Sequence, residues 1–425
     1  MKKNITVSLF VAAMVAMPLQ VQAQGILGKL LKKVEKVLNV EVLANEQTSE
    51  NEQNVANVED NGKPRYEIHE TSATKKITIR GGAQELCPFS NGRALVKTNK
   101  GWMVINKSGE IVFNLPEGYE PIASTYDNGR LMVKQNTNSI YYINAAILDV
   151  DGNIIKNFEK LHDASGFMDG VAIIKVDENG EWVNYHIDTD GNILSKTLPA
   201  NEGMLGGYKL YHLREGLRPF YDKKVERWGF SDAQCNIVIK PQFKNGGGFF
   251  EGLAPVKNEE DLWGYIDRTG NYVIEPMYTN VPGAFHAGRA LVKDKAEARY
   301  YIDCTGNFVW SEGSRDYYNE YKDFMSTGYA VWVLDRDAYL VNSDFKVVAQ
   351  YSGIDRSGEI VSYTDKWFEW YTSWNYMHRL YDYQGHLLLE FEISGGSFSE
   401  GVSCRNGYYF NDKGEILVRF YDTQF

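Results

Sequence analysis

The chain has 425 residues, 43% of them hydrophobic and 24% charged, which is the composition of a soluble globular protein. Its formal net charge of −11 argues against nucleic acid and anionic lipid as partners of the folded part, because like charges repel. Aromatic residues make up 13% and favour strands over helices. The length suits two or three ordinary domains or one array of repeats.

Residues 1–23 have the pattern of a secretory signal peptide. Lys2 and Lys3 form a short basic region, residues 5–17 are apolar, and residues 21–23 offer small side chains for cleavage. The apolar run is too short to span about 30 Å of hydrocarbon, so a transmembrane anchor is not expected. We therefore expect export to the periplasm, the cell surface or the medium.

Residues 25–44 predict one amphipathic helix, since apolar residues recur at three- and four-residue spacing with four lysines on the other face. Such a helix either packs against the folded domain or touches a membrane surface or a partner, and the sequence leaves both open. Residues 45–64 are rich in Asn, Glu and Gln and predict a flexible linker. The folded domain is expected over residues 65–425.

A unit of roughly 40 residues recurs from about residue 85 to the C-terminus. Its first half is an aromatic residue, two variable residues, Gly and then alternating small and branched residues, as in FHAGRALVK from Phe285. Its second half is an aromatic-led strand, a turn with Asp or Asn before Gly, and an apolar strand. The leading glycines lie at 92, 129, 170, 216, 252, 288, 328 and 401, and the last interval has room for a degenerate unit near Gly358. The sequence thus predicts about nine β-hairpin-rich units.

The best-formed unit begins at Trp263, and its residues have separate structural tasks. Asp267 is expected to cap the hairpin turn and Gly270 to take the positive φ that closes it. Phe285 is expected to fill the gap to the next unit, and Gly288 to let the backbone turn. The Asp-x-Asp-Gly-Asn segments at 149–153 and 188–192 are interpreted as the same turn rather than as calcium loops, because they lack a downstream Glu.

This unit resembles the WG-repeat (KWG-repeat) family, whose pattern is W-G-Y/F-I-D-x-x-G-x-x-V-I-x-P-x-Y/F followed by F-x-x-G-x-A-x-V. The segment from Trp228 to Val256 is a second good match. The resemblance implies a repeat domain over about residues 66–425, in a family that is mostly bacterial and often exported. It supplies no catalytic residues. The positions that carry it are Trp228, Gly229, Trp263, Gly264, Asp267, Gly270, Phe285 and Gly288.

Two arrangements of the all-β units remain open. An open or curved solenoid-like array is the first expectation, because a repeat buries its apolar face by stacking on its neighbours. A closed β-propeller is the alternative, because about 40 residues also suit one blade. Closure would require the strand near residues 76–80 to complete the last unit.

Cysteines and histidines give no metal or cofactor motif. Cys87, Cys235, Cys304 and Cys404 allow three pairings into two disulfides in an oxidising compartment, and free thiols are the alternative. Their spacing differs from that of zinc ligands, and the seven histidines form no H-x-x-x-H pattern. We expect neither a metal nor a cofactor.

One aromatic stretch departs from the repeat, with Trp367, Trp370 and Trp374 accompanied by Tyr371. These side chains either fill the core of the degenerate unit or form a platform for a sugar ring or a peptide. The leading hypothesis is a non-catalytic exported protein that binds a protein or glycan at the cell envelope or outside the cell, with membrane contact only through residues 25–44. A glycan-processing enzyme on the same scaffold and a structural spacer are the competing hypotheses.

Overall fold

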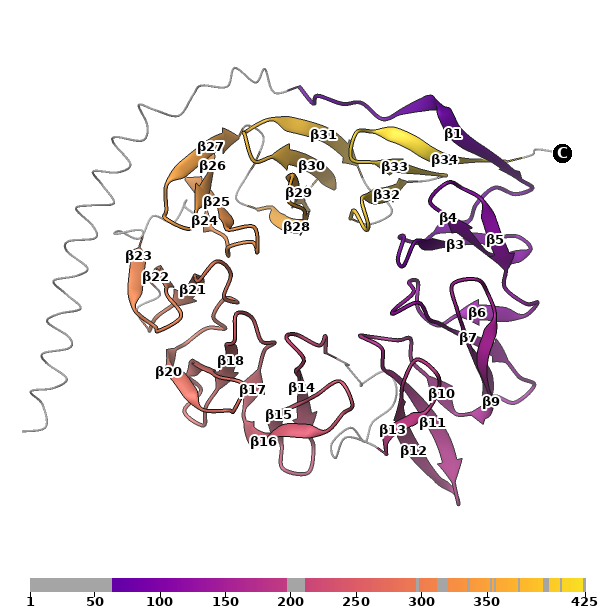
Figure 1. Cartoon of the computed structure of the whole chain (residues 1–425), viewed down its shortest axis with the longest axis horizontal. Helices are drawn as coiled ribbons and strands as arrows, with labels where there is room; N and C mark the ends of the chain where they lie inside the picture. The colour runs from indigo at the N-terminus through magenta and orange to yellow at the C-terminus, as the bar shows by residue number, and fades with distance from the viewer. Residues whose placement is uncertain are drawn as a thin grey trace, which may run out of the picture.

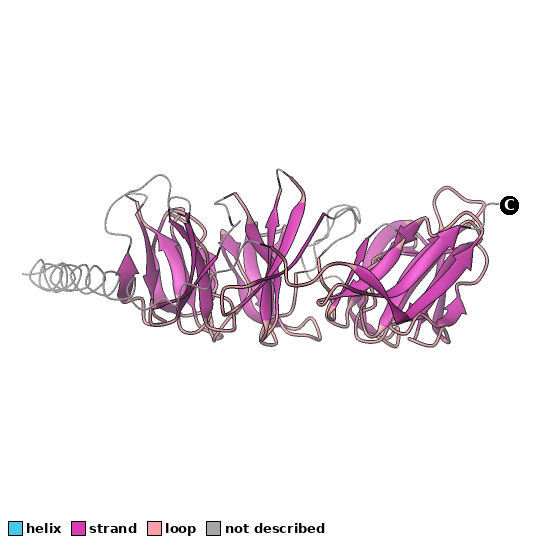
Figure 2. Cartoon of the chain, turned by 90° about the horizontal axis from the view of Figure 1, so that it is seen from above, coloured by secondary structure: helices cyan, strands magenta, loops and turns pink. Residues whose placement is uncertain are grey.

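Nine small sheets stand around a central opening like the blades of a propeller (Figure 1). The computed structural model describes residues 63–196, 211–295, 298–311, 320–334, 337–351, 354, 357–373, 375–392, 397–405 and 407–422. These residues form strands β1 to β34 and no helix, and the edge-on view shows a flat disc of strands and loops (Figure 2). The predicted all-β fold of nine units is confirmed. The signal peptide, the helix and nearly all of the linker predicted before residue 63 lie outside the described residues.

Blades 1 to 4 follow one another along the chain. Blade 1 contains β2 (Glu85–Leu86), β3 (Arg93–Thr98), β4 (Gly101–Asn106) and β5 (Ile111–Asn114). Blade 2 contains β6 (Tyr119–Pro121), β7 (Leu131–Asn136), β8 (Ile143–Leu148) and β9 (Ile154–Leu161). Blade 3 contains β10 (Asp163–Ala164), β11 (Ala172–Glu178), β12 (Glu181–Ile187) and β13 (Ile193–Lys196). Blade 4 contains β14 (Arg218–Asp222), β15 (Arg227–Ser231) and β16 (Ile237–Phe243).

Blades 5 to 9 complete the ring. Blade 5 contains β17 (Asn245–Gly246), β18 (Ala254–Lys257), β19 (Trp263–Ile266) and β20 (Tyr272–Tyr278), and blade 6 contains β21 (Ala290–Lys293), β22 (Arg299–Ile302) and β23 (Phe308–Ser311). Blade 7 contains β24 (Glu320–Tyr321), β25 (Tyr329–Leu334), β26 (Asp337–Asn342) and β27 (Val347–Tyr351). Blade 8 contains β28 (Glu359–Tyr363), β29 (Trp367–Thr372), β30 (Met377–Asp382) and β31 (Leu387–Glu392). Blade 9 contains β32 (Val402–Arg405), β33 (Tyr408–Asn411), β34 (Glu415–Asp422) and β1 (His69–Ile79).

The ring is closed by the N-terminal strand. Strand β1 runs parallel to β34, with Lys76 opposite Arg419 and Ile77 opposite Phe420. A buried core then joins blade 9 to blade 1, where the rings of Phe89 and Tyr409 lie 4.9 Å apart. The expected open array is therefore wrong, and the alternative of a closed propeller is correct. Closure covers the outer edge of the last blade and gives both end blades an apolar neighbour.

In blades 4 and 5 the glycine of the Trp-Gly pair is required for steric reasons. A Cβ atom on Gly264 would lie 2.5 Å from the carbonyl oxygen of Ile274, and one on Gly229 would lie 2.6 Å from that of Ile239. The β19–β20 ladder shifts register between Trp263 and Tyr265, and this bulge brings the two backbones together. Only glycine leaves room for the outer strand at this point.

Each hairpin turn is capped by its own side chain, as the sequence predicts. Asp267 Oδ1 accepts hydrogen bonds from the backbone N–H groups of Thr269 and Asn271 at 2.9 and 3.0 Å. The Thr269 hydroxyl also donates to this carboxylate and holds the pKa of Asp267 below its usual value. Gly270 has a φ of +89°, and its Cβ position lies 2.9 Å from Ile239 in the preceding blade. The turn therefore needs glycine both for its φ and for contact between blades.

The two segments that resemble calcium loops cap their turns in the same way. Asp149 Oδ1 accepts from the N–H groups of Asp151 and Asn153, and Asp188 Oδ1 accepts from those of Asp190 and Asn192. These four distances are 2.8 or 2.9 Å. Turn capping is thus the structural role of both segments.

The F-x-x-G turns link neighbouring blades. Phe285 is fully buried and its ring lies 4.9 Å from that of Tyr265 in the preceding blade, so it fills the gap as predicted. At several of these turns the residue before the glycine reaches the next blade. Glu251 accepts from the Gly288 N–H at 2.7 Å, Glu215 from Gly252 at 2.9 Å, and Glu400 from Gly92 at 3.1 Å. A series of side-chain hydrogen bonds therefore fastens successive blades.

The four cysteines are all free thiols. Cys87 packs in the core between blades 1 and 2, whereas Cys404 packs in the core between blades 9 and 1. Burial raises the pKa of Cys87 to about 12 and that of Cys404 to about 11. Cys235 is buried in blade 4, and Cys304 is exposed in blade 6. Of the two possibilities left by the sequence, the structure contains the unpaired thiols.

Candidate functional site

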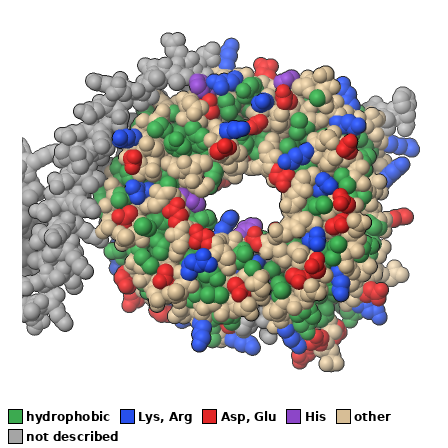
Figure 3. Space-filling model, in the orientation of Figure 1, with side chains coloured by type: hydrophobic (Ala, Val, Ile, Leu, Met, Phe, Trp, Pro, Cys, Tyr) green, Lys and Arg blue, Asp and Glu red, His purple; other side chains and the backbone are tan. Residues whose placement is uncertain are grey.

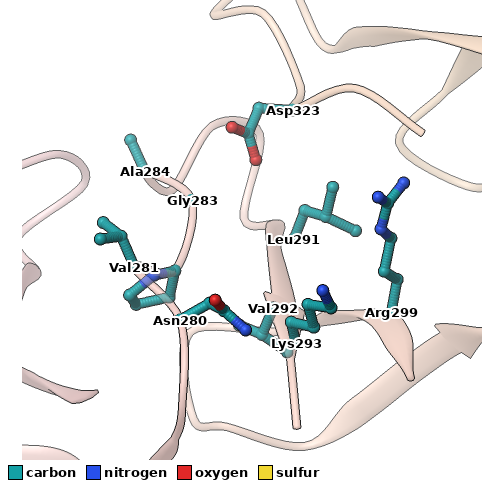
Figure 4. A pocket seen from close by; sticks show the side chains of 10 residues that line it. Asn280, Val281, Gly283, Ala284, Leu291, Val292, Lys293, Arg299 and Asp323 are labelled. Carbon is teal, nitrogen blue, oxygen red and sulfur yellow. The ribbon is translucent and has the colours of Figure 1, made fainter. Parts of the chain in front are cut away.

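A recess of about 370 Å³ lies at the inner side of blade 6. Figure 1 places β21 on the side of this blade nearest the central opening, and Figure 3 shows charged side chains around the margin of that opening. The segment 280–284, which leads into the F-x-x-G turn, forms one wall, and β21 forms another. Arg299 of β22 and Asp323 of blade 7 complete the lining (Figure 4).

The recess lies where other blades carry a short inner strand. In blades 1, 2, 3, 5 and 7 an acidic residue or an asparagine of the inner strand stands opposite a residue of the next strand, and that opposing residue is a lysine in all but blade 7. The pairs are Glu85 with Lys97, Glu120 with Lys134, Asp163 with Lys175, Asn245 with Lys257, and Glu320 with Val333.

Blade 6 has the same connection without the inner strand. The Gly283 N–H donates to the Leu291 carbonyl at 2.8 Å, as Gly247 does to Pro255 in blade 5. This alignment puts Val281 in register with Lys293. No strand is assigned inside β21 among the described residues, and Val281 is 69% exposed. Proline alone does not explain the difference, because Pro121 of β6 has the register of Pro282 and still belongs to a strand.

Asp323 reaches the recess from blade 7. Its carboxylate accepts a hydrogen bond from the backbone of Leu291, and any side chain at Gly283 would collide with it. The Asp323 side chain is exposed to the recess, but many protein atoms lie around its carboxyl group. The resulting desolvation raises the pKa of Asp323 to about 6. In blade 3 the Ser165 hydroxyl accepts from the Ile173 N–H at 2.8 Å. Asp323 therefore accepts a backbone hydrogen bond from β21, as Ser165 accepts one from β11.

Two cations occupy the other side of the recess. Lys293 and Arg299 stand directly opposite each other on β21 and β22, an arrangement that is unfavourable unless anions are near. Arg299 Nη1 lies 3.0 Å from Glu320 Oε2 of blade 7. Figure 4 shows Asp323 across the recess from Lys293. With Val281 and Leu291 as apolar walls, the site can hold an acidic group beside an apolar one.

The predicted aromatic site lies in blade 8, and none of its residues lines this recess. Trp367 and Trp370 are 3% and 0% exposed, so neither presents a face to solvent. Trp367 Nε1 donates to Asp412 at 2.9 Å, and its ring packs against Phe398. Tyr371 is half-buried on the same strand, and Trp374 lies outside the described residues. Of the two interpretations of these indoles, core filling agrees with the positions of Trp367 and Trp370.

Sequence reasoning missed two features of the surface. Trp182 is 54% exposed, with the His162 ring 3.9 Å away and Lys175 Nζ 4.5 Å from the centre of its ring. The other feature is the recess itself. The sequence signal for it is Val281, which replaces the acidic or amide residue that the aligned units carry. In the part of the chain that the structure describes, no three His, Cys, Asp or Glu side chains group as metal ligands.

The family model described as "WG containing repeat" matches residues 228–260 and 263–295. The chain carries WG repeats. The matched residues include the last two strands of blade 4, all four strands of blade 5 and the first strand of blade 6, so the second match ends at the recess. The resemblance to the WG-repeat family is confirmed for these residues.

Solved structures with partial likeness have sequence identities near 10%. BamB from Moraxella catarrhalis is 10% identical, with 68% of this chain and 93% of that chain covered and a TM-score of 0.36. Apo AztD from Citrobacter koseri is also 10% identical, with 72% and 95% covered and a TM-score of 0.33. Hsv2 from Kluyveromyces lactis is 9% identical, with 73% and 98% covered and a TM-score of 0.33. Similarity at this level says nothing about what the WG-repeat chain binds.

No curated protein sequence matches the chain. Across the described ranges, no helix has the length and apolar character needed to cross a bilayer.

Proposed function

We propose that this WG-repeat propeller is an exported, non-catalytic binding protein whose partner is another protein at the cell envelope or outside the cell. The recess of blade 6 is the observation that carries the proposal. It interrupts a pattern that five other blades keep, and it places charged and apolar groups together in a concave site. Such a combination is typical of binding pockets. The signal pattern of residues 1–23 supports the exported location.

Binding without catalysis agrees with the roles of the charged groups in the recess. Asp323 has a raised pKa, which is a property of many catalytic acids, but its carboxylate is occupied by the backbone of Leu291. Arg299 is held by Glu320. These contacts give the charged groups structural tasks and support a docking site over a glycan-processing centre.

A protein partner is favoured over a glycan by the exposed surface. Sugar rings bind on open aromatic faces, whereas Trp367 and Trp370 are buried in the core and the exposed indole of Trp182 is flanked by His162 and Lys175. The recess instead combines the apolar side chains of Val281 and Leu291 with Lys293 and Arg299. Those groups complement the acidic and apolar side chains of a protein.

Photo-crosslinking in the exporting cells tests this function. A photoreactive amino acid at position 281, in the recess, is compared with one at Val273 of β20, which is 44% exposed. The proposal predicts a discrete covalent adduct with an exported protein from position 281 and none from position 273. No adduct from position 281, or the same adducts from both positions, would overturn the proposal.

A further inference from the structure

Blade 4 has two polar residues at a pair of positions that is apolar in other blades. Two residues after the glycine of the F-x-x-G turn, blades 1, 3, 5 and 6 have a buried alanine opposite a buried isoleucine of the next strand. The pairs are Ala94 with Ile105, Ala172 with Ile187, Ala254 with Ile266, and Ala290 with Ile302. In blade 4 the corresponding pair is Arg218 with Ser231, which are 1% and 0% exposed.

This polar pair faces blade 3. Side chains alternate between the two faces of a strand, so Arg218 points to the same side of β14 as Phe220. Phe220 packs against Val171 and Leu194 of blade 3. Ser231 is directly opposite Arg218 and therefore shares that face.

Blade 3 contributes a buried histidine to the same interface. On β12, Tyr185 and Ile187 belong to the core between blades 2 and 3, so the side chain of His186 between them points towards blade 4. His186 is 1% exposed, and its Nδ1 atom lies 3.1 Å from the Ser195 hydroxyl. Blades 4, 5 and 6 have fully buried aromatic residues at the corresponding position, namely Phe230, Tyr265 and Tyr301. The interface of blades 3 and 4 is thus polar where later interfaces are apolar.

The polar groups of the two blades lie close together. Desolvation and the nearby charge of Arg218 lower the pKa of His186 to about 4. The imidazole is therefore neutral at neutral pH. When the Ser195 hydroxyl donates to Nδ1, the proton of the neutral ring is on Nε2, which can then donate a hydrogen bond.

The charge of Arg218 has no direct counterpart among the described residues. Its Nε, Nη1 and Nη2 atoms are buried without a hydrogen-bond partner there, as are His186 Nε2 and the Ser231 hydroxyl. An arginine keeps its charge even when buried. The carboxylates of Asp169, Asp127 and Asp232 act on this charge without forming an ion pair with it, and each accepts a hydrogen bond from a backbone N–H group elsewhere.

The chemistry of these groups indicates what satisfies them. A guanidinium, an imidazole N–H and a hydroxyl can all donate hydrogen bonds. A water molecule accepts from two donors but brings two donors of its own, and it leaves the charge unbalanced. An anion accepts from all of these groups and also balances the guanidinium. Because the three side chains are at most 1% exposed, the anion has to be about as small as a water molecule.

We propose that a monovalent anion of the size of chloride binds between blades 3 and 4, where it accepts hydrogen bonds from the Arg218 guanidinium, His186 Nε2 and the Ser231 hydroxyl. The ion connects the two blades through charge-assisted hydrogen bonds, whereas apolar side chains connect blades 4, 5 and 6. This site is separate from the recess of blade 6 and goes beyond the proposed function.

A crystal of the full chain locates the ion directly. The protein is purified and crystallised with bromide as the only halide, because bromide replaces chloride and has an anomalous signal. The proposal predicts an anomalous peak within hydrogen-bond distance of both Arg218 and Ser231. A water molecule without anomalous signal at this place, or an empty site, overturns the proposal.

Thermal unfolding tests the same site in solution. When chloride replaces gluconate at constant ionic strength, the melting temperature of the wild type should rise saturably by about 2–4 °C, as for a ligand that binds only the folded state. Arg218→Ala/Ser231→Ile copies the Ala290–Ile302 pair of blade 6 and should lose this response. Arg227→Gln is the control, because Arg227 lies on the same hairpin and pairs with Glu259.

The comparison of variants separates ion binding from general salt effects. The control should keep the chloride response of the wild type. No response in the wild type, or an equal response in the wild type and the double variant, overturns the proposal. If the double variant does not fold, the bromide crystal decides the question.

Discussion

The glycine of the Trp-Gly pair offers the sharpest test of how WG repeats pack. In Gly264→Ala the new Cβ atom would lie 2.5 Å from the Ile274 carbonyl oxygen and 2.8 Å from the Pro276 nitrogen. Both are backbone atoms of β20, so relief requires the outer strand to move by several tenths of an ångström. Overpacking of this kind costs about 1–3 kcal/mol, and we expect the upper half of that range because backbone yields less than a side chain.

Gly246→Ala in the same blade is the matched control. Its Cβ atom would meet the end of the Phe230 ring at 3.3 Å, and Gly246 does not have a positive φ. Replacing glycine by alanine under these conditions changes stability by less than about 1 kcal/mol, because the unfolded chain loses freedom as well. Urea unfolding followed by tryptophan fluorescence compares the two variants. A loss below about 0.5 kcal/mol for Gly264→Ala, or equal losses for both variants, would refute the steric explanation.

Three further predictions concern the ring and the recess. Glu251→Ala should lower the free energy of unfolding by about 1 kcal/mol, because the Gly288 N–H loses its acceptor. Glu251→Gln keeps an acceptor, so its free energy of unfolding should fall by less, and chemical denaturation compares the two variants. Asp323 has a raised pKa in the folded state, so its contribution to stability should fall as the pH rises from about 4 to above 6. The difference in melting temperature between Asp323→Asn and wild type should therefore grow in favour of the variant over that range, and a constant difference contradicts the burial argument. A chain that begins at residue 81 lacks β1 and should melt well below one that begins at residue 63, since blade 9 loses its outer strand; equal melting temperatures would show that β1 does not hold the ring closed.

The repeat made much of the fold predictable from the sequence. Asp267, Gly270 and Phe285 have the tasks that their types and spacing predict, because these tasks are local to one unit or its neighbour. The closure of the ring was not predictable in the same way. It depends on parallel pairing between residues 69–79 and 415–422, and the first of these segments has no repeat pattern. An open and a closed array therefore have the same sequence signature.

The candidate site could not be predicted from the sequence, because it arises where the described part of blade 6 has no inner strand. The inner strands of blades 1, 3, 5 and 7 are two residues long, too short for any periodic signal. Only alignment of the blades through their hydrogen bonds shows that Val281 stands at an acidic position. The Trp367 and Trp370 indoles attracted attention because they leave the repeat register, but large apolar side chains are most often buried, as these are.

Filling the recess with the chain's own inner strand is the most direct test of the account. The variant Val281→Asp/Pro282→Ala copies Asp163 and Ala164 of blade 3, which pair with Lys175 and Ile174. With a photoreactive residue at position 280, the account predicts that the wild-type background crosslinks the partner and the variant background does not. The variant should melt at the same temperature as wild type or above it. Equal crosslinking in both backgrounds would contradict the claim that blade 6 binds the partner through its missing strand.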